Sequence, residues 1–190
     1  MAPRGLKFAV ALVDYFTKRA ETIPLSTITE KNLTKFIREH IIYKFGIPYS
    51  LVSDNAFQFD NQAVRNLCDQ FGINEDFSAL YHPQSNGQVE AVKKIIKVTL
   101  KRRLDTLKAR WAAELPLVLR SYRTMARIVT GETPFWIACG TEVMIPAEVK
   151  VPSFWYENFD EETNTSFLAA ERDMIEEHRE VARIRMEAQT

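Results

Sequence analysis

Hydrophobic residues in the first 80 positions switch repeatedly between the spacing of strands and the spacing of helices. Residues 6–13 form an apolar run typical of a buried strand, and residues 19–25 alternate as an antiparallel partner would. Thr29 suits the N-cap of a helix that Gly46 would end. The order strand, strand, helix, strand, helix, strand predicts an α/β domain. The expected strands are 6–15, 19–25, 49–53 and 73–80, and the expected helices are 29–45 and 60–71.

The second half of the chain is expected to be mostly helical. Ser85 and Gln88 form a capping box, which predicts that a long helix opens there and covers 84–108. A helix over 111–126 follows, and then glycines and prolines predict irregular structure. The expected parts are a core domain (1–127), an irregular extension with a linker (128–163) and a charged helix outside the main core (164–190).

Composition excludes several classes of protein. With 46% hydrophobic and 26% charged residues, a chain of 190 residues can bury a core and is not a disordered tail. No apolar run approaches the roughly 20 residues that span a bilayer, so no membrane segment is expected, and no export signal is recognisable. Cys68 and Cys139 are far apart in sequence, which fits a reducing compartment better than a disulfide framework. No Cys or His pair has the spacing of a zinc site.

The formal net charge of zero hides a strong asymmetry along the chain. Residues 1–90 carry a net charge of −1, residues 91–141 carry +8 and residues 142–190 carry −7. A basic segment of this kind is typical of an electrostatic surface for phosphates. The alternative is an ordinary solvated helix that is rich in lysine.

Two carboxylates lie at positions that suit a catalytic or metal-binding site. Asp54 directly follows the strand expected over 49–53, and ligands of open α/β sheets lie beyond the carboxyl ends of strands. The alternative is that Asp54 caps its own turn. Glu90 lies on the long helix and shares a face with lysines, among them Lys94 and Lys97, while apolar residues share another face. The alternative is that Glu90 and Lys94 form a surface pair.

The sequence segments that contain these two carboxylates resemble the motifs of a known family. Residues 51–59 (LVSDNAFQF) and 82–90 (HPQSNGQVE) resemble the two central motifs of retroviral and gypsy-type LTR retrotransposon integrases. The resemblance extends over nearly the whole chain. The further matching segments are 13–18, 45–48, 122–124, 130–135, 145–149 and 157–161.

The resemblance implies a ribonuclease H-like core, with a mixed sheet flanked by helices. It also implies that two Asp and one Glu bind two Mg²⁺ or Mn²⁺ ions, which activate a water or a DNA 3′-hydroxyl. Asp54 matches the second catalytic Asp and Glu90 the catalytic Glu, and Lys94 and Lys97 match positions that contact element-end DNA. Retroelement ends and target DNA would be the partners, homo-oligomers are expected, and the location would be the nucleus. The expected DNA-binding residues are Lys93, Lys94, Lys97, Lys101, Arg102 and Arg103.

One departure from the family pattern bears on activity. The first catalytic Asp of the family lies on a first strand upstream of the position of Asp14, whereas this sequence starts at Met1, after that strand. That strand is central in the family's sheet, so the strands near 6–15 and 49–53 are expected to keep unpaired edges. With two of three carboxylates, the chain is expected to be inactive alone. The alternative function is a retroelement relic that binds nucleic acid or protein without chemistry.

Overall fold

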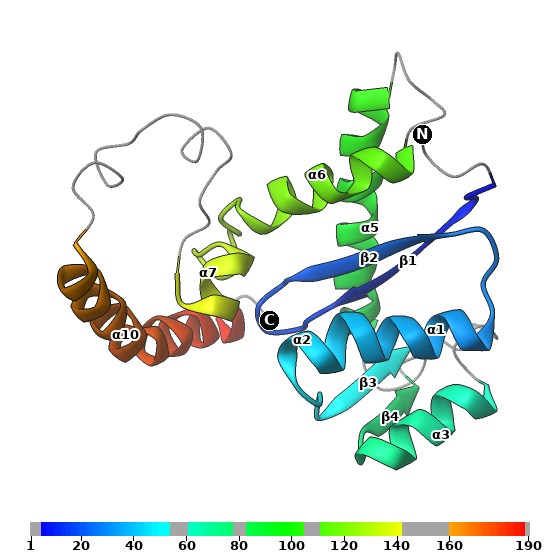
Figure 1. The fold of residues 1–190 in the computed structure, drawn as a ribbon, viewed down its shortest axis with the longest axis horizontal. Helices are drawn as coiled ribbons and strands as arrows, with labels where there is room; N and C mark the ends of the chain where they lie inside the picture. Colours follow the sequence, from blue (N-terminus) through cyan, green and yellow to red (C-terminus); the bar gives the residue numbers. More distant parts are fainter. Residues whose placement is uncertain (1–4, 54–60, 78–82, 105–110, 142–159, 189–190) are drawn as a thin grey trace. The chain divides into compact units, whose positions relative to one another are not determined.

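The computed structural model describes residues 5–53, 61–77, 83–104, 111–141 and 160–188 (Figure 1). The chain divides into two compact units. The first holds the residues up to Tyr15 together with Ala20–Leu119, and the second holds Phe16–Arg19 together with Arg120–Thr190. No described helix is long and apolar enough to cross a membrane.

The first unit contains two separate two-stranded sheets. Strands β1 (Phe8–Val13) and β2 (Ala20–Leu25) pair antiparallel, as expected. Strands β3 (Ser50–Ser53) and β4 (Asn74–Phe77) pair parallel. Within the described ranges no strand pairs with the second edge of β1 or of β3. The strand pairing and the helices between the strands agree with the α/β fold class expected from the sequence.

The helix expected over 29–45 forms with an internal irregularity. It consists of α1 (Glu30–Phe36), the π-helical segment η1 (Ile37–Ile42) and α2 (Tyr43–Phe45). The hydroxyl of Thr29 accepts a hydrogen bond from the backbone N–H of Asn32 at 3.3 Å, as an N-cap does. Gly46 ends the helix with φ +89°, which glycine adopts more easily than other residues.

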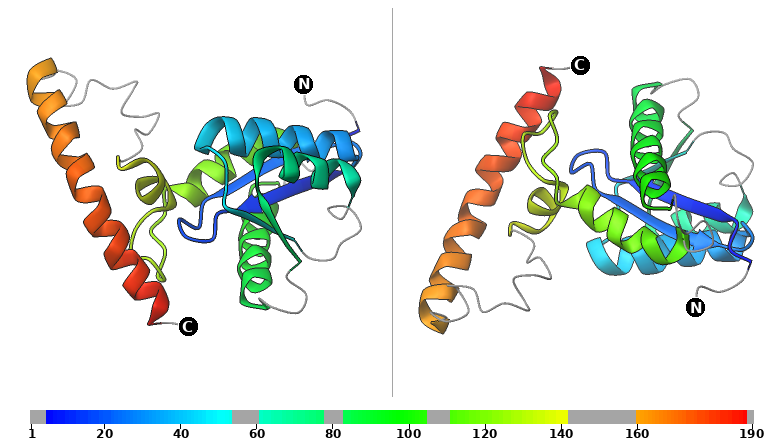
Figure 2. Two further views of the ribbon diagram at one scale, coloured as in Figure 1. Left: turned by 90° about the horizontal axis from the view of Figure 1, so that it is seen from below. Right: turned by 90° about the horizontal axis from the view of Figure 1, so that it is seen from above.

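Helices cover both faces of the β1–β2 pair (Figure 2). On one side, α1 and η1 bury Leu33, Phe36 and Ile37 in a core that also receives Val10 of β1. Helix α3 (Gln62–Phe71) adds buried apolar side chains to the same core. On the other side, α5 (Pro83–Leu104) packs on β1.

The long helix does not begin where the capping box predicted. Helix α5 starts at Pro83, so Ser85 lies inside the helix and is not its N-cap. Proline suits the first helical turn because its backbone has no N–H to satisfy there. Helix α6 (Trp111–Arg123) follows, and Arg103 Nε donates to Glu114 Oε2 at 3.2 Å, which ties α5 to α6.

The second unit contains α7 (Pro134–Cys139) and α10 (Glu161–Glu187). Helix α7 lies in the segment expected to be irregular. It forms because Thr133 caps it by accepting from the N–H of Trp136 at 3.0 Å. Helix α10 begins at Glu161, three residues before the start expected at 164, because Asp160 Oδ2 accepts from the N–H of Thr163 at 2.7 Å. That bond and a second one from Thr163 lower the pKa of the Asp160 carboxyl.

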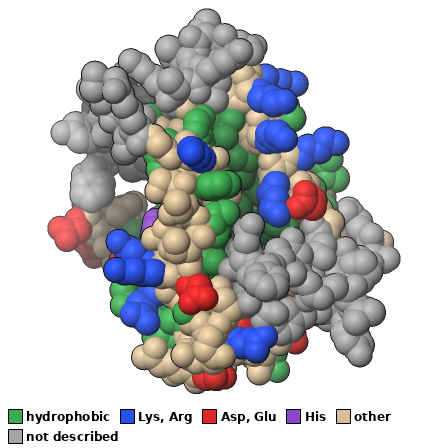
Figure 3. All heavy atoms as spheres, turned by 90° about the vertical axis from the view of Figure 1, so that its right-hand side faces the viewer, with side chains coloured by type: hydrophobic (Ala, Val, Ile, Leu, Met, Phe, Trp, Pro, Cys, Tyr) green, Lys and Arg blue, Asp and Glu red, His purple; other side chains and the backbone are tan. Residues whose placement is uncertain are grey.

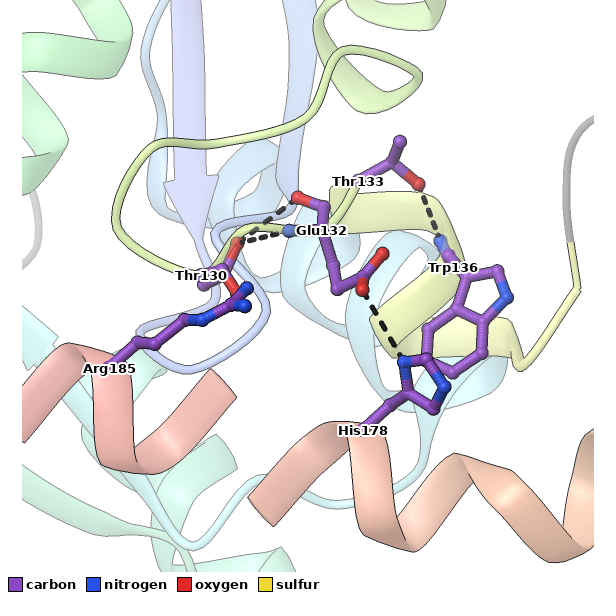
Figure 4. A network of polar contacts seen from close by, with 6 residues as sticks. All are labelled: Thr130, Glu132, Thr133, Trp136, His178 and Arg185. Carbon is purple, nitrogen blue, oxygen red and sulfur yellow. Dashed lines mark hydrogen bonds and ion pairs between the residues drawn. The ribbon is translucent and has the colours of Figure 1, made fainter. Parts of the chain in front are cut away.

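Polar contacts hold α10 against the segment around α7 (Figure 4). His178 Nδ1 lies 3.4 Å from Glu132 Oε1, and the His178 ring packs on Trp136 with centroids 4.5 Å apart. Arg185 Nη1 donates to the carbonyl of Thr130 at 3.2 Å, and Arg179 adds a bond to the carbonyl of Ile137. This side of α10 therefore packs against other residues of the second unit.

Candidate nucleic-acid interface

Helix α5 separates an apolar face from a charged face. Val92 and Ile96 are each 6% exposed and lie on the face that packs on β1. Glu90, Lys94 and Lys97 are exposed, and so is Lys101, so the charged face predicted from the helical period is present. Figure 3 shows Lys and Arg side chains following one another along this helix, with an acidic side chain beside them.

Glu90 has a cationic partner, but it is not Lys94, the partner that the alternative interpretation named. Its Oε1 accepts from Lys93 Nζ at 2.8 Å, so the pair has i,i+3 spacing and does not involve Lys94. Residues three and four apart are both neighbours on a helix, which is why the spacing alone could not choose between them. The Glu90 side chain is 68% exposed, and such pairs contribute about 0.2–1 kcal/mol. Glu90 can therefore exchange this partner for another cation at little cost.

The six predicted DNA-binding residues fall into two groups. Lys93 is paired with Glu90, and Arg103 is paired with Glu114 of α6. The other four are exposed and form no ion pair with any described residue. These four are Lys94, Lys97, Lys101 and Arg102.

The charged face of α5 borders an open depression in the surface. Its lining combines one carboxylate, Glu90, with three ammonium groups; the lining residues are Gly87, Glu90, Ala91, Lys93, Lys94 and Lys97. Ammonium groups at this density attract phosphate oxygens. A carboxylate oxygen is a ligand that Mg²⁺ prefers. The arrangement can therefore hold an anionic backbone beside a metal-binding oxygen.

The second predicted carboxylate, Asp54, lies outside the described residues, so its distance from Glu90 remains a prediction. Strand β3 ends at Ser53, and Asp54 therefore follows the carboxyl end of a parallel strand in the sequence. In the part of the chain that the structure describes, no three His, Cys, Asp or Glu side chains form a metal-binding group.

Two features of the second unit are not among those predicted from the sequence. The His178–Glu132 contact joins residues far apart in the chain, and no local pattern announces it. The other feature is an exposed apolar row on α10, which includes Phe167 and Met174. Their seven-residue separation was the signal that could have revealed this row.

Comparison with curated proteins finds viral polyproteins. No protein-family profile matches the chain. The chain is 40% identical over 138 residues to the Gag-Pol polyprotein of woolly monkey sarcoma virus. It is 38% identical over 137 residues to the Gag-Pol polyprotein of feline leukemia virus. Each match covers 72% of this chain and 8% of the polyprotein, so the chain spans a small part of these relatives.

Comparison with solved structures finds integrase cores. The catalytic core domain of BIV integrase matches with a TM-score of 0.59 and 25% identity, over 68% of this chain and 84% of that one. The HTLV-2 integrase catalytic core domain in complex with magnesium, in a trimeric form, matches with a TM-score of 0.56 and 20% identity, over 66% and 80%. An intasome of simian T-cell lymphotropic virus matches with a TM-score of 0.62 and 19% identity, over 72% and 50%. The last two likenesses concern the fold.

Proposed function

The chain carries a core domain of the retroviral integrase type, and from this premise we propose that it serves DNA integration by metal-dependent polynucleotidyl transfer. The observation that carries the proposal is the charged face of α5. There, Lys94, Lys97 and Lys101 are exposed beside Glu90, while the opposite face of the helix is fixed on β1. The fold thus presents cations and a carboxylate together on a rigid element.

DNA is the proposed partner of this face. Ammonium groups spaced along a helix can follow the phosphates of a duplex, and such contacts read no bases. Retroelement ends and target DNA would therefore be bound with little dependence on sequence. From the likeness to integrases we also propose that the protein acts in the nucleus and that copies of the chain assemble.

Asp54 and Glu90 are the proposed ligands of a divalent cation, Mg²⁺ or Mn²⁺. Their carboxylate oxygens fit the preference of hard cations. When bound, such a cation activates a water or 3′-hydroxyl for an in-line displacement. Glu90 must release Lys93 to bind the cation, and Lys94 and Lys97 would hold the phosphates beside it.

We further propose that residues 1–190 bind DNA without catalysing the reaction by themselves. The family's site needs three carboxylates, and the motifs of this sequence supply two, Asp54 and Glu90. The alternative function is a relic that keeps the binding surface and has no chemistry even in its natural context. Both functions predict binding through α5, so binding and catalysis are tested separately.

The first test measures how DNA affinity depends on salt. Each phosphate contact contributes about 0.9 to the slope of log K against log salt concentration on duplex DNA. Replacing Lys94→Ala and Lys97→Ala together should therefore flatten the slope by about 2 and weaken all duplexes similarly. Fluorescence anisotropy with two unrelated duplexes at several salt concentrations provides the measurement.

A matched control removes the same charge elsewhere in the first unit. Lys31 and Lys35 are exposed on α1, on the other side of β1 and β2, so Lys31→Ala with Lys35→Ala should leave the slope unchanged. An unchanged slope in the α5 variant would show that its lysines only solubilise the helix. Equal effects of the two variants would show diffuse attraction by overall charge.

The second test measures catalysis with a labelled oligonucleotide that carries an element end. We expect neither 3′-processing nor strand transfer with Mg²⁺ or Mn²⁺, because two carboxylates do not complete the site. Metal-dependent nicking that disappears in Asp54→Asn would contradict this prediction and show that another group of this chain completes the site.

A further inference from the structure

Helix α10 carries a row of exposed apolar side chains beside the face that it packs on its own unit. Phe167, Met174 and Val181 recur every seven residues and are 56%, 52% and 41% exposed, and Ile184 is 54% exposed. The other face, which includes Ile175 and Ala182, is less exposed. Apolar residues at seven-residue spacing are typical of a helix that packs along a second helix.

Helix α5 carries a matching row between its basic face and its buried face. Ala91, Ile95, Val98 and Arg102 are separated by four, three and four residues, which places them along one line on the helix. Ile95 is 42% exposed and Val98 is 40% exposed. The row is distinct from Val92 and Ile96, which face β1.

The charges beside the two rows have opposite signs. On α10, Glu177 lies within the row, and Glu180 and Glu187 flank it; all three are exposed. On α5, Arg102 lies within the row, and Lys94 and Lys101 flank it; these are exposed as well. The acidic and basic residues repeat with the same seven-residue separation, Glu180 to Glu187 and Lys94 to Lys101.

We propose that α10 of one copy of this chain packs antiparallel along α5 of a second copy. In antiparallel helix pairs, each core position of one helix faces the complementary core position of the other. One register brings apolar residues opposite apolar residues and basic residues opposite acidic residues along the whole contact. It pairs Arg102 with Glu177, Val98 with Val181 and Ile95 with Ile184, and it places Lys101 beside Glu180 and Lys94 beside Glu187.

Pairing of α10 with another α10 is disfavoured by charge. In a parallel pair, Glu177 would lie against Glu177 of the second copy inside the apolar row. In an antiparallel pair of two α10 helices, the acidic residues that flank the two rows would face each other, with Asp173 of one copy beside Glu180 of the other. Like charges in such positions are destabilising, whereas α5 offers a cation at each of the corresponding positions.

The carboxylates on α10 remain available for this contact. Glu180 and Glu187 each pair with Arg183 on their own helix, and their side chains are 53% and 63% exposed. A carboxylate has about four lone-pair positions and can accept from a lysine as well as from Arg183. Exposed pairs within a helix contribute only about 0.3–0.5 kcal/mol, so they offer little resistance to rearrangement.

The size of the contact predicts weak association. The matched stretches, 91–102 and 177–188, are each about 18 Å long at 1.5 Å per residue. A single contact of this length falls below the area of a stable interface, but two copies that exchange α10 reciprocally form it twice. We therefore expect a reversible dimer at micromolar concentrations, weakened by salt. The proposal does not depend on DNA binding, and its test contains no nucleic acid.

The test uses two charge-reversal variants of the full chain. One carries Lys94→Glu and Lys101→Glu on α5, and the other carries Glu180→Lys and Glu187→Lys on α10. Sedimentation equilibrium should show dimers of the original chain and monomers of each variant alone. An equimolar mixture of the variants should dimerise again, because the reversed α5 of one meets the reversed α10 of the other. Circular dichroism checks that both variants fold.

Each other outcome overturns the proposal. A monomeric original chain up to about 200 μM, far above the micromolar range expected here, removes the interface. Dimerisation of the α5 variant alone shows that α10 pairs with α10 or that another surface is used. A mixture that stays monomeric shows that the reversed charges do not meet between copies.

Cross-linking provides a second measurement that does not rely on charge. Val98→Cys and Val181→Cys are placed in separate chains that also carry Cys139→Ser, since Cys139 is the exposed native cysteine and Cys68 is buried. Mild oxidation of the mixture should give the mixed disulfide in at least tenfold excess over either disulfide between identical chains. Equal yields of the three disulfides would contradict the proposed register.

Discussion

Gly131 is a position in the second unit where both the backbone conformation and the available space favour glycine. Its φ is +78°, and a Cβ built on it would lie 1.7 Å from Arg185 Nη1, the group that donates to the carbonyl of Thr130. Gly72 shares the positive φ, at +67°, but a Cβ there would meet nothing within 4 Å. An alanine at Gly72 therefore adds only backbone strain, whereas an alanine at Gly131 adds the same strain and also disturbs the contact with Arg185.

Replacing Gly131→Ala should destabilise the chain more than Gly72→Ala does. The left-handed conformation costs a non-glycine residue about 1–2 kcal/mol at either position. At Gly131 the new methyl group must also displace the guanidinium of Arg185, whose side chain is exposed and flexible, so the added loss is that of one hydrogen bond, about 0.5–1.5 kcal/mol. Urea unfolding followed by circular dichroism measures both losses. Equal losses would mean that Arg185 moves aside without cost and that its bond to Thr130 contributes nothing.

Strands β1 and β3 lie in two separate two-stranded sheets of the first unit. Each pairs on one edge with a neighbour, β2 or β4, and within the described residues neither has a strand on its other edge. Helices α1 and α5 nevertheless cover the two faces of the β1–β2 pair. The apolar core thus forms on both faces of the β1–β2 pair, although within the described residues each of β1 and β3 has a strand partner on one edge only.

Amide hydrogen exchange along β1 should alternate with a period of two. In an antiparallel pair, every second N–H of a strand points at its partner and the others point away. Protection should therefore be high at alternate residues of Phe8–Val13 and low at those between, as measured by NMR on the native chain. Uniform protection along the strand would show that a further segment pairs with its second edge.

At the scale of the whole molecule, the basic and acidic parts of the chain belong to different compact units. The basic face of α5 lies in the first unit, and the acidic helix α10 lies in the second. The zero net charge is thus the sum of segments with opposite net charge. Both proposals for this protein use the same lysines of α5, Lys94 and Lys101, for DNA phosphates or for α10 of a second copy.

DNA and self-association should therefore compete. With donor and acceptor dyes on separate copies, energy transfer should fall as a duplex is added, because phosphates displace the carboxylates from Lys94 and Lys101. Dextran is the control because it carries no charge. At the same mass concentration as the duplex, it should leave the energy transfer unchanged. Transfer that persists at saturating DNA would show that the two contacts use different surfaces of α5.

The sequence by itself determined the features that depend on local physics. Apolar periodicity located the strands and helices, and the side chain of Thr29 and the glycine at position 46 defined the ends of the first helix, because caps and stops act within one turn. The helical period also determined which residues of α5 are buried and which carry charge outward. The motifs resemble those of integrases, and this resemblance implies the ribonuclease H-like fold without knowledge of any contact.

Only the tertiary structure decided which partners those residues find. Arg103 pairs with Glu114 of the next helix, and His178 contacts Glu132 across 46 positions of sequence. Such contacts depend on how elements pack, and the spacing of residues within one element carries no information about that packing. The seven-residue spacing of the α10 row is present in the sequence, but only the fold shows that this row and the row on α5 are left uncovered.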